Sequence, residues 1–205
     1  MLGLANLITL SRFPLLVLVL ALLYPPSAVA RWTAVGLLFI LIMMDTLDGF
    51  VARRRGESSL LGSVLDIAAD RAVEIVLWVC FADLRLIPLA IPIVVIIRGV
   101  VVDALRGASA RRGLTPFSVT ASKWGKRIVA SPAMRTAYGV AKGVAFCALA
   151  ATQALRVYSV GSPHRSALHG ISLLATIMSW IAATLCVVRA IPVFIEAPSF
   201  LTKRR

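Results

Sequence analysis

Four aspartates lie within residues 45–70 and are spaced so that they fall on two helix faces. Asp45 and Asp48 are three residues apart, and Asp66 and Asp70 are four apart, so each pair shares one face if the stretch is helical. Carboxylates gathered near lipid repel one another and cost about 2.5–3.5 kcal/mol each. Divalent cations relieve that cost, and oxygen-only ligands favour Mg²⁺ or Mn²⁺ over zinc. The spacing therefore predicts two divalent cations in a phosphoryl-transfer site.

Small residues share these acidic faces. Gly49 follows the first aspartate by four residues, Ala52 follows the second by four, and Gly62 precedes the third by four. A helix face with carboxylates and little bulk leaves a hollow that a ligand can fill. The alternative is a polar turn at the membrane surface in which the acids form ion pairs with the neighbouring arginines, and such exposed pairs contribute little.

The elements that must position these acids are those of an integral membrane protein. The chain has 205 residues, of which 60% are hydrophobic, whereas soluble domains are usually about 45–50% apolar. Apolar runs that continue into charged flanks predict an all-α fold with six transmembrane helices, at about 6–24, 31–55, 58–82, 86–112, 134–157 and 165–195. The polar interval 107–133 predicts a juxtamembrane segment between helices four and five. We expect one membrane domain over residues 1–205.

Lys and Arg gather on one side of this expected topology. The chain carries 22 Lys and Arg against 9 Asp and Glu, for a net charge of +13. The side that holds the 53–59 turn receives most of these cations, which makes it cytoplasmic and places both termini inside. The charge therefore indicates anchoring to anionic lipid rather than nucleic-acid binding, and a multi-pass protein of the inner (cytoplasmic) membrane with its site facing the cytoplasm. A signal peptide cleaved after Ala30 is the alternative for the first apolar run, and it would leave five helices.

The spacing of the acids and the small residues resembles a known pattern. Asp45-x-x-Asp48-Gly49-x-x-Ala52-Arg53, followed after eight residues by Gly62-x-x-x-Asp66-x-x-x-Asp70, resembles the signature of the CDP-alcohol phosphotransferase family. The resemblance implies transfer of a substituted phosphate from a CDP-linked donor, here CDP-diacylglycerol, to an acceptor alcohol with release of CMP, and it implies a homodimer. It also implies roles for single residues: two Mg²⁺ or Mn²⁺ ions on Asp45, Asp48, Asp66 and Asp70, a catalytic base at Asp70, and donor binding by Asp48, Gly49, Ala52, Arg53 and Gly62.

The N-terminal sequence and a basic cluster bear on the acceptor. The opening "LANLITLSRF" resembles that of phosphatidylglycerophosphate synthases, with Asn6, Thr9 and Arg12 at matching spacing, although Gly99 stands where that group has an acidic residue. Basic residues near the cytoplasmic ends of helices four and five could bind an acceptor phosphate or serve only as membrane anchors: Arg98, Arg106, Lys123, Lys126, Arg127 and Arg135. We expect glycerol 3-phosphate as acceptor, with inositol phosphate or another alcohol as the alternative.

Two other functions are compatible with acidic helix faces in a membrane. A membrane prenyltransferase would bind a diphosphate through Asp-rich helices and Mg²⁺ and would release pyrophosphate rather than CMP. A cation transporter would move metal ions without any dependence on nucleotide. The Gly-x-x-Ala-Arg continuation of the first aspartate pair favours the CDP-alcohol chemistry over both.

Overall fold

The computed structural model describes residues 4–55, 60–110, 131–158 and 165–202. Side chains within these ranges are described except at 4–6, 45–55, 60–61, 108–110 and 196–202 and at Ser63, Arg106 and Pro132. The described ranges form six helices and contain no strand: α1 (Leu4–Leu23), α2 (Ala28–Arg55), α3 (Leu60–Asp83), α4 (Ala90–Ala110), α6 (Pro132–Leu155) and α7 (Arg165–Thr202). The prediction of an all-α fold is confirmed, and most of the polar interval 107–133 lies outside the described residues.

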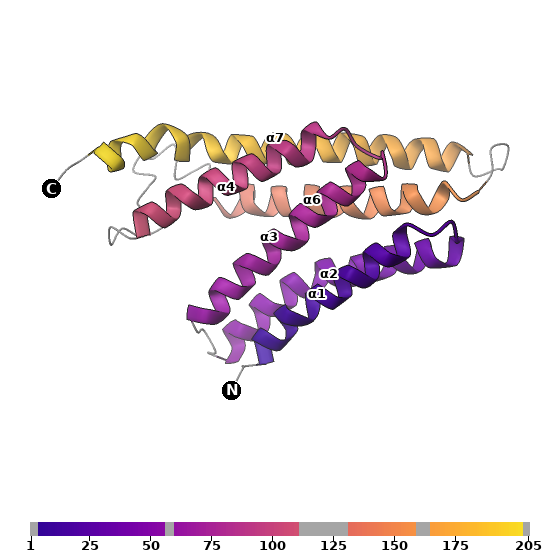
Figure 1. The fold of residues 1–205 in the computed structure, drawn as a ribbon, viewed down its shortest axis with the longest axis horizontal. Helices are drawn as coiled ribbons and strands as arrows, with labels where there is room; N and C mark the ends of the chain where they lie inside the picture. Colours follow the sequence, from indigo (N-terminus) through magenta and orange to yellow (C-terminus); the bar gives the residue numbers. More distant parts are fainter. Residues whose placement is uncertain (1–3, 56–59, 111–130, 159–164, 203–205) are drawn as a thin grey trace.

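The six helices run back and forth along the long axis of the molecule. Figure 1 shows the start of α1, the end of α2 and the start of α3 in the left half of the view, with the ends of α4 and α7 further to the left. The turns that join α1 to α2 and α3 to α4 lie toward the other end. The described helix ends that the predicted topology assigns to the cytoplasm therefore lie in the same half of the molecule.

Proline and serine set the boundaries of several helices. Pro25 and Pro26 lie two and three residues after Leu23, the last residue of α1, and cannot continue its hydrogen-bond pattern. Ser27 then accepts a hydrogen bond from the Ala30 backbone N–H at 3.3 Å, as a residue preceding the first turn of a helix does. At α6, Ser131 precedes a proline in the first turn, where a missing N–H has no cost.

Two arginines tie the turns at the end away from the termini. Arg31 donates hydrogen bonds to two carbonyl oxygens of the α1–α2 turn, at 2.8 and 3.3 Å, and to the Gln153 carbonyl of α6 at 3.0 Å. Arg156, which follows α6, donates to the carbonyl oxygens of Leu84 and Arg85 in the α3–α4 turn, at 3.0 and 3.3 Å. These bonds satisfy carbonyl groups that helix ends leave without a partner.

Helix α6 lies at the centre of the packing. It packs against α2 and α7, and α1 packs against both α2 and α3. Trp78 and Phe81 of α3 are fully buried and contact Phe146 of α6, with ring centroids 4.6 and 5.9 Å apart. This aromatic contact is worth about 0.5–1.5 kcal/mol per pair beyond burial and fixes α3 against α6.

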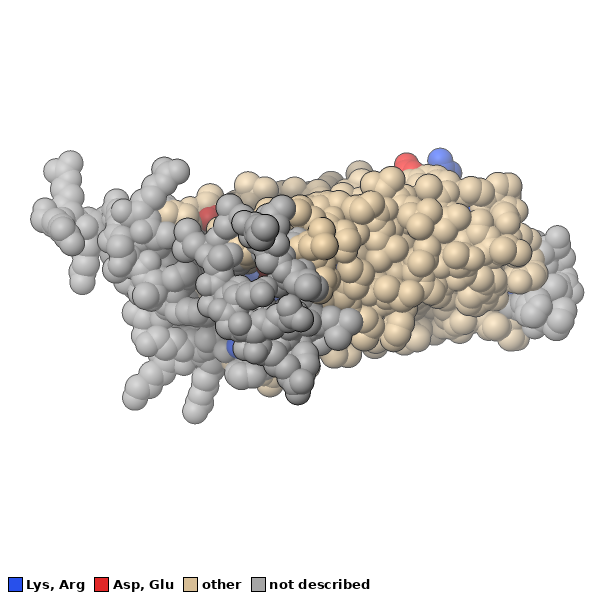
Figure 2. All heavy atoms as spheres, turned by 90° about the horizontal axis from the view of Figure 1, so that it is seen from below, with Lys and Arg blue, Asp and Glu red and all other residues tan. Residues whose placement is uncertain are grey.

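Large apolar side chains are exposed on all six described helices. Figure 2 shows a face on which the described right half is a broad uncharged area, with charged atoms only at its upper edge, while the other visible charged atoms lie in the left half. Two helices in the described part of the chain are long and apolar enough to cross a membrane, at Ala133–Leu155 and Arg165–Ile195. This surface is typical of a chain that borders lipid.

Candidate active site

Three acidic residues of α3 lie on one face of the helix and differ in exposure. Asp66, Asp70 and Glu74 follow one another at intervals of four residues, so they form a single stripe. The Asp66 and Asp70 side chains are 49% and 43% exposed, whereas that of Glu74 is 2% exposed. The first two carboxylates are therefore accessible to a ligand, and the third is part of the interior.

Arg12 of α1 supplies a buried positive charge to the accessible acids. Its side chain is 2% exposed, and its guanidinium nitrogens lie 3.9 Å from Asp66 Oδ1 and from Asp70 Oδ1. One cation thus faces both carboxylates from a neighbouring helix. Because α1 carries it on a buried face, the charge keeps a fixed position, as a guanidinium held by packing does.

Glu74 is surrounded by hydrogen-bond donors and cations. The Tyr138 hydroxyl of α6 donates a short hydrogen bond to Glu74 Oε1. Arg71 Nη1 lies 3.4 Å from Glu74 Oε2, and Lys142 Nζ lies 3.6 Å from the same oxygen. A buried carboxylate is tolerated only when it is paired and hydrogen-bonded in this way.

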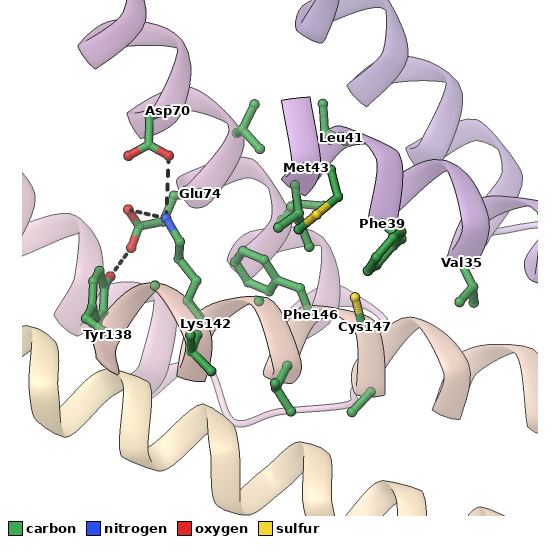
Figure 3. Close-up of a pocket in the computed structure, with 18 of the residues that line it drawn as sticks. Val35, Phe39, Leu41, Met43, Asp70, Glu74, Tyr138, Lys142, Phe146 and Cys147 are labelled. Carbon is green, nitrogen blue, oxygen red and sulfur yellow. Dashed lines mark hydrogen bonds and ion pairs between the residues drawn. The ribbon is translucent and has the colours of Figure 1, made fainter. Parts of the chain in front are cut away.

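Lys142 links the buried acid to an accessible one. Its Nζ lies 3.5 Å from Asp70 Oδ1 and 3.6 Å from Glu74 Oε2, and Figure 3 shows the side chain reaching from α6 to both carboxylates. The Tyr138 ring is 5.7 Å from the Lys142 ammonium group and 5.5 Å from the Arg189 guanidinium group. Arg71 also reaches Asp103 of α4, at 3.5 Å. The network therefore joins α3, α4, α6 and α7.

A cavity of about 1040 Å³ opens beside these groups. Its polar end is lined by six cations and two acids: Arg12, Arg71, Arg98, Arg135, Lys142, Arg189, Asp70 and Glu74. Its other end is apolar and runs between α2 and α6, past Val35, Phe39, Met43, Val144 and Cys147. An excess of positive charge beside an apolar surface suits an anionic group attached to a hydrocarbon tail.

Arg98 is the most buried cation on the α4 side of this cavity. It is 8% exposed, and its Nε is buried with no hydrogen-bond partner among the described residues. A buried polar group without a partner is costly, by about 1–3 kcal/mol. An anion at the polar end of the cavity would supply the missing acceptor.

Comparison with known proteins decides the family. The sequence model of a family described as CDP-alcohol phosphatidyltransferase matches residues 2–188. The chain belongs to this family. One similar protein is the CDP-diacylglycerol--glycerol-3-phosphate 3-phosphatidyltransferase of Pseudomonas fluorescens, which is 33% identical over 128 residues. That similarity covers 62% of this chain and 66% of the relative, just under two thirds of the relative's length.

The structure describes the side chains of only the second half of the CDP-alcohol phosphatidyltransferase signature. Gly62, Asp66 and Asp70 lie on the first turns of α3, with Gly62 partly exposed. The first half of the signature lies on the last turns of α2, where the side chains are outside the described set: Asp45, Asp48, Gly49, Ala52 and Arg53. The roles of both halves therefore remain predictions.

The basic cluster is divided in the same way. Arg98 and Arg135 line the cavity, as the acceptor prediction requires. The Arg106 side chain on α4 is outside the described set, and Lys123, Lys126 and Arg127 lie outside the described residues. Arg189 of α7 also lines the cavity, and the sequence analysis did not identify it.

The described carboxylates fit a site for hard divalent cations. Asp66 and Asp70 offer half-exposed oxygen ligands on one helix face, which is the chemistry that Mg²⁺ and Mn²⁺ prefer. Within the described ranges no three His, Cys, Asp or Glu side chains gather closely enough to hold a metal alone. The predicted four-aspartate site includes Asp45 and Asp48 of α2, whose side chains are not among those described.

Proposed function

We propose that the protein transfers the phosphatidyl group of CDP-diacylglycerol to glycerol 3-phosphate and releases CMP. The observation that carries this proposal is the cationic end of the cavity beside Asp70, in a chain of the CDP-alcohol phosphatidyltransferase family. The name of the Pseudomonas fluorescens relative supports the same donor and acceptor. The same chemistry with inositol phosphate or another alcohol is the alternative.

In the proposed reaction Asp70 acts as the base. The acceptor hydroxyl oxygen forms a bond to the phosphorus that carries diacylglycerol, the bond from that phosphorus to the bridging oxygen breaks, and CMP leaves. The hydroxyl proton passes to an Asp70 carboxylate oxygen, whose 43% exposure leaves it accessible from the cavity. Proton transfer to a positioned base typically raises the reaction rate by about 10²–10⁴-fold.

Two Mg²⁺ or Mn²⁺ ions, held by Asp45, Asp48, Asp66 and Asp70, would neutralise charge on the diphosphate and on the leaving group. Asp48 and Arg53 bind the CDP moiety, and the small residues Gly49, Ala52 and Gly62 allow it to approach the helix backbones. Arg12 stands behind Asp66 and Asp70 and offsets part of their mutual repulsion. These residues hold the donor while the acceptor enters from the polar end of the cavity.

The acceptor phosphate is bound by the basic cluster. Arg98 supports this because it is a buried guanidinium with an Nε that lacks a described partner. Guanidinium groups form paired, charge-assisted hydrogen bonds to phosphate. The remaining members of the proposed cluster are Arg106, Lys123, Lys126, Arg127 and Arg135, and Arg189 lies at the same end of the cavity.

The proposed setting is a cytoplasmic (inner) membrane. The shortest described helix that must cross, α1, has 20 residues and spans about 30 Å, which matches the hydrocarbon core. All six described helices cross, with both termini, the 107–133 segment and the active site on the cytoplasmic side. Residues 1–205 form one domain, and two copies form a homodimer.

The test is an acceptor screen with purified protein. CDP-diacylglycerol and Mn²⁺ or Mg²⁺ are mixed with glycerol 3-phosphate, inositol phosphate, inositol or serine, and released CMP is measured. The proposal expects the highest CMP release with glycerol 3-phosphate. Release with serine or free inositol alone would overturn the phosphorylated acceptor. Pyrophosphate release from a prenyl donor, or metal flux without nucleotide, would support the two rival functions instead.

A further inference from the structure

Lys142 lies beside Asp70, the residue that receives the acceptor proton in the proposed reaction. Its ammonium group is 3.5 Å from Asp70 Oδ1 and 3.6 Å from Glu74 Oε2. Lys142 belongs to α6, whereas both acids belong to α3. One side chain therefore fixes the reacting part of α3 relative to the central helix of the bundle (Figure 3).

Glu74 holds the Lys142 ammonium group in place. Glu74 is 2% exposed and also accepts the Tyr138 hydrogen bond and the Arg71 contact, so its carboxylate has little freedom to move. Tyr138 precedes Lys142 by four residues and lies on the same face of α6. A buried network whose members are all paired is rigid, because moving one group leaves another unpaired at low dielectric.

Asp70 needs such a support because it is 43% exposed. A carboxylate at a half-exposed position can adopt several side-chain rotamers, and only some of them point an oxygen at the cavity. The two cations that contact it, Lys142 at 3.5 Å and Arg12 at 3.9 Å, both approach Oδ1. That leaves Oδ2 as the oxygen that can face the acceptor hydroxyl.

We propose that Lys142 is a positioning residue of this enzyme, anchored by Glu74, and that it orients Asp70 toward the acceptor hydroxyl. The inference rests on the proposed function, in which Asp70 takes the proton. Lys142 does not contact the reacting atoms in this account. Its effect on rate passes through the orientation of Asp70, since a misplacement of about 1 Å in a reacting group costs on the order of 10²-fold.

The first experiment compares Lys142→Met and Lys142→Arg with the unaltered protein in the CMP-release assay. Lys142→Met should lower kcat by about 10- to 100-fold and change both substrate KM values by less than about threefold, because it misplaces the base without removing a binding group. Lys142→Arg keeps a cation beside both acids and should recover most of kcat. Arg165→Met, which removes an exposed cation at the start of α7, is the matched control and should leave kcat unchanged.

The second experiment is a double-mutant cycle with Asp70→Asn. If Lys142 acts through Asp70, adding Lys142→Met to Asp70→Asn should lower kcat by less than about twofold further. A product of the two single effects would mean that Lys142 acts independently, and it would overturn the inference. A rise in the KM of the acceptor with kcat unchanged would also overturn it, because Lys142 would then be an acceptor-binding residue.

Folding and the proposed function are checked separately. Binding of CDP-diacylglycerol to each variant reports whether the site is still assembled, and Lys142→Gln, which keeps a hydrogen-bond donor, replaces Lys142→Met if the latter does not fold. No CMP release by the unaltered protein with any acceptor would overturn the proposed function and this inference with it. An active parent protein with an equally active Lys142→Met would overturn this inference alone.

Discussion

At the scale of single residues, burial divides one acidic stripe into two kinds of site. Asp66 and Asp70 are half-exposed and face Arg12, whereas Glu74, one turn further along α3, is inside the bundle. The same residue spacing thus supplies accessible carboxylates at the helix start and a structural anchor one turn later. The difference arises because α6 covers the helix at Glu74 and brings Tyr138 to its carboxylate.

The Tyr138 hydroxyl group should contribute measurably to stability. Tyr138→Phe removes the donor that pairs with Glu74 and leaves a buried carboxylate oxygen with one partner fewer, which should lower the free energy of unfolding by about 1–3 kcal/mol. Tyr24→Phe is the matched control, because its hydroxyl group also donates to a carboxylate, that of Asp83 at 2.8 Å, but is exposed. Thermal unfolding in detergent should show a clear loss for Tyr138→Phe and a smaller one for Tyr24→Phe. Equal losses would contradict the role given to burial.

The sequence predicts the arrangement of the aspartates better than it predicts the residues that contact them. Spacing alone identifies Asp66 and Asp70, because the two residues lie one turn apart on the same helix. Glu74 continues that spacing and could have been identified in the same way. Lys142 and Tyr138 are 72 and 64 residues from their acidic partners, so their roles depend on how α3 packs against α6. The four-residue spacing of Tyr138 and Lys142 indicates that they share one face of α6. No property of the sequence shows which acids that face contacts.

Among the helices, the bounds predicted from the sequence agree with the structure to within a few residues in most cases. Charged residues and prolines mark most of these helix ends. The predicted helices at 6–24 and 58–82 correspond to α1 (Leu4–Leu23) and α3 (Leu60–Asp83). The largest difference is α7, which continues to Thr202 although the predicted helix ends at 195. Pro198 lies within this extension, and α7 continues past it because a proline inside a helix is tolerated where other groups satisfy the freed carbonyl.

The turns at the end away from the termini should depend on their arginines. Arg31→Met removes three hydrogen bonds from a charged donor, and the free energy of unfolding should fall by about 2 kcal/mol. Arg165→Met removes an exposed arginine from the start of α7 and serves as the control, with an expected change below about 0.5 kcal/mol. Unfolding by heat in detergent measures both. No difference between the two variants would mean that these bonds do not hold the α1–α2 turn against α6.

In the whole molecule, the predicted side of most Lys and Arg residues coincides with the half in which several helix ends lie. The start of α1, the end of α2 and the end of α7 lie in the same half of the molecule along its long axis (Figure 1), and the net charge of +13 comes mainly from residues that the sequence prediction assigns to that side. The broad uncharged area of the described surface is suited to contact with a bilayer (Figure 2). In the proposed orientation the cationic part of the cavity would face the cytoplasm, where the proposed phosphorylated acceptor is dissolved.

The orientation in the membrane can be tested by labelling introduced cysteines. In a chain without its native cysteines, Ser58→Cys should react only with a membrane-permeable reagent, and Gly161→Cys should react with an impermeable one. The reason is that most Lys and Arg lie on the side of residue 58, which the positive-inside rule makes cytoplasmic. The reverse pattern would contradict the orientation, and a mature chain that begins at Arg31 would contradict the six crossings.

We expect the four aspartates to serve CDP-dependent phosphatidyl transfer, with Asp70 as the base. The most direct measurement is CMP release from CDP-diacylglycerol and glycerol 3-phosphate by the unaltered protein and by Asp70→Asn, each with Mn²⁺ or with chelator. We expect CMP release to need the metal and to fall by at least about 10²-fold in Asp70→Asn, while CDP-diacylglycerol binding is largely kept. Full release in chelator, or near-normal release by Asp70→Asn, would contradict it.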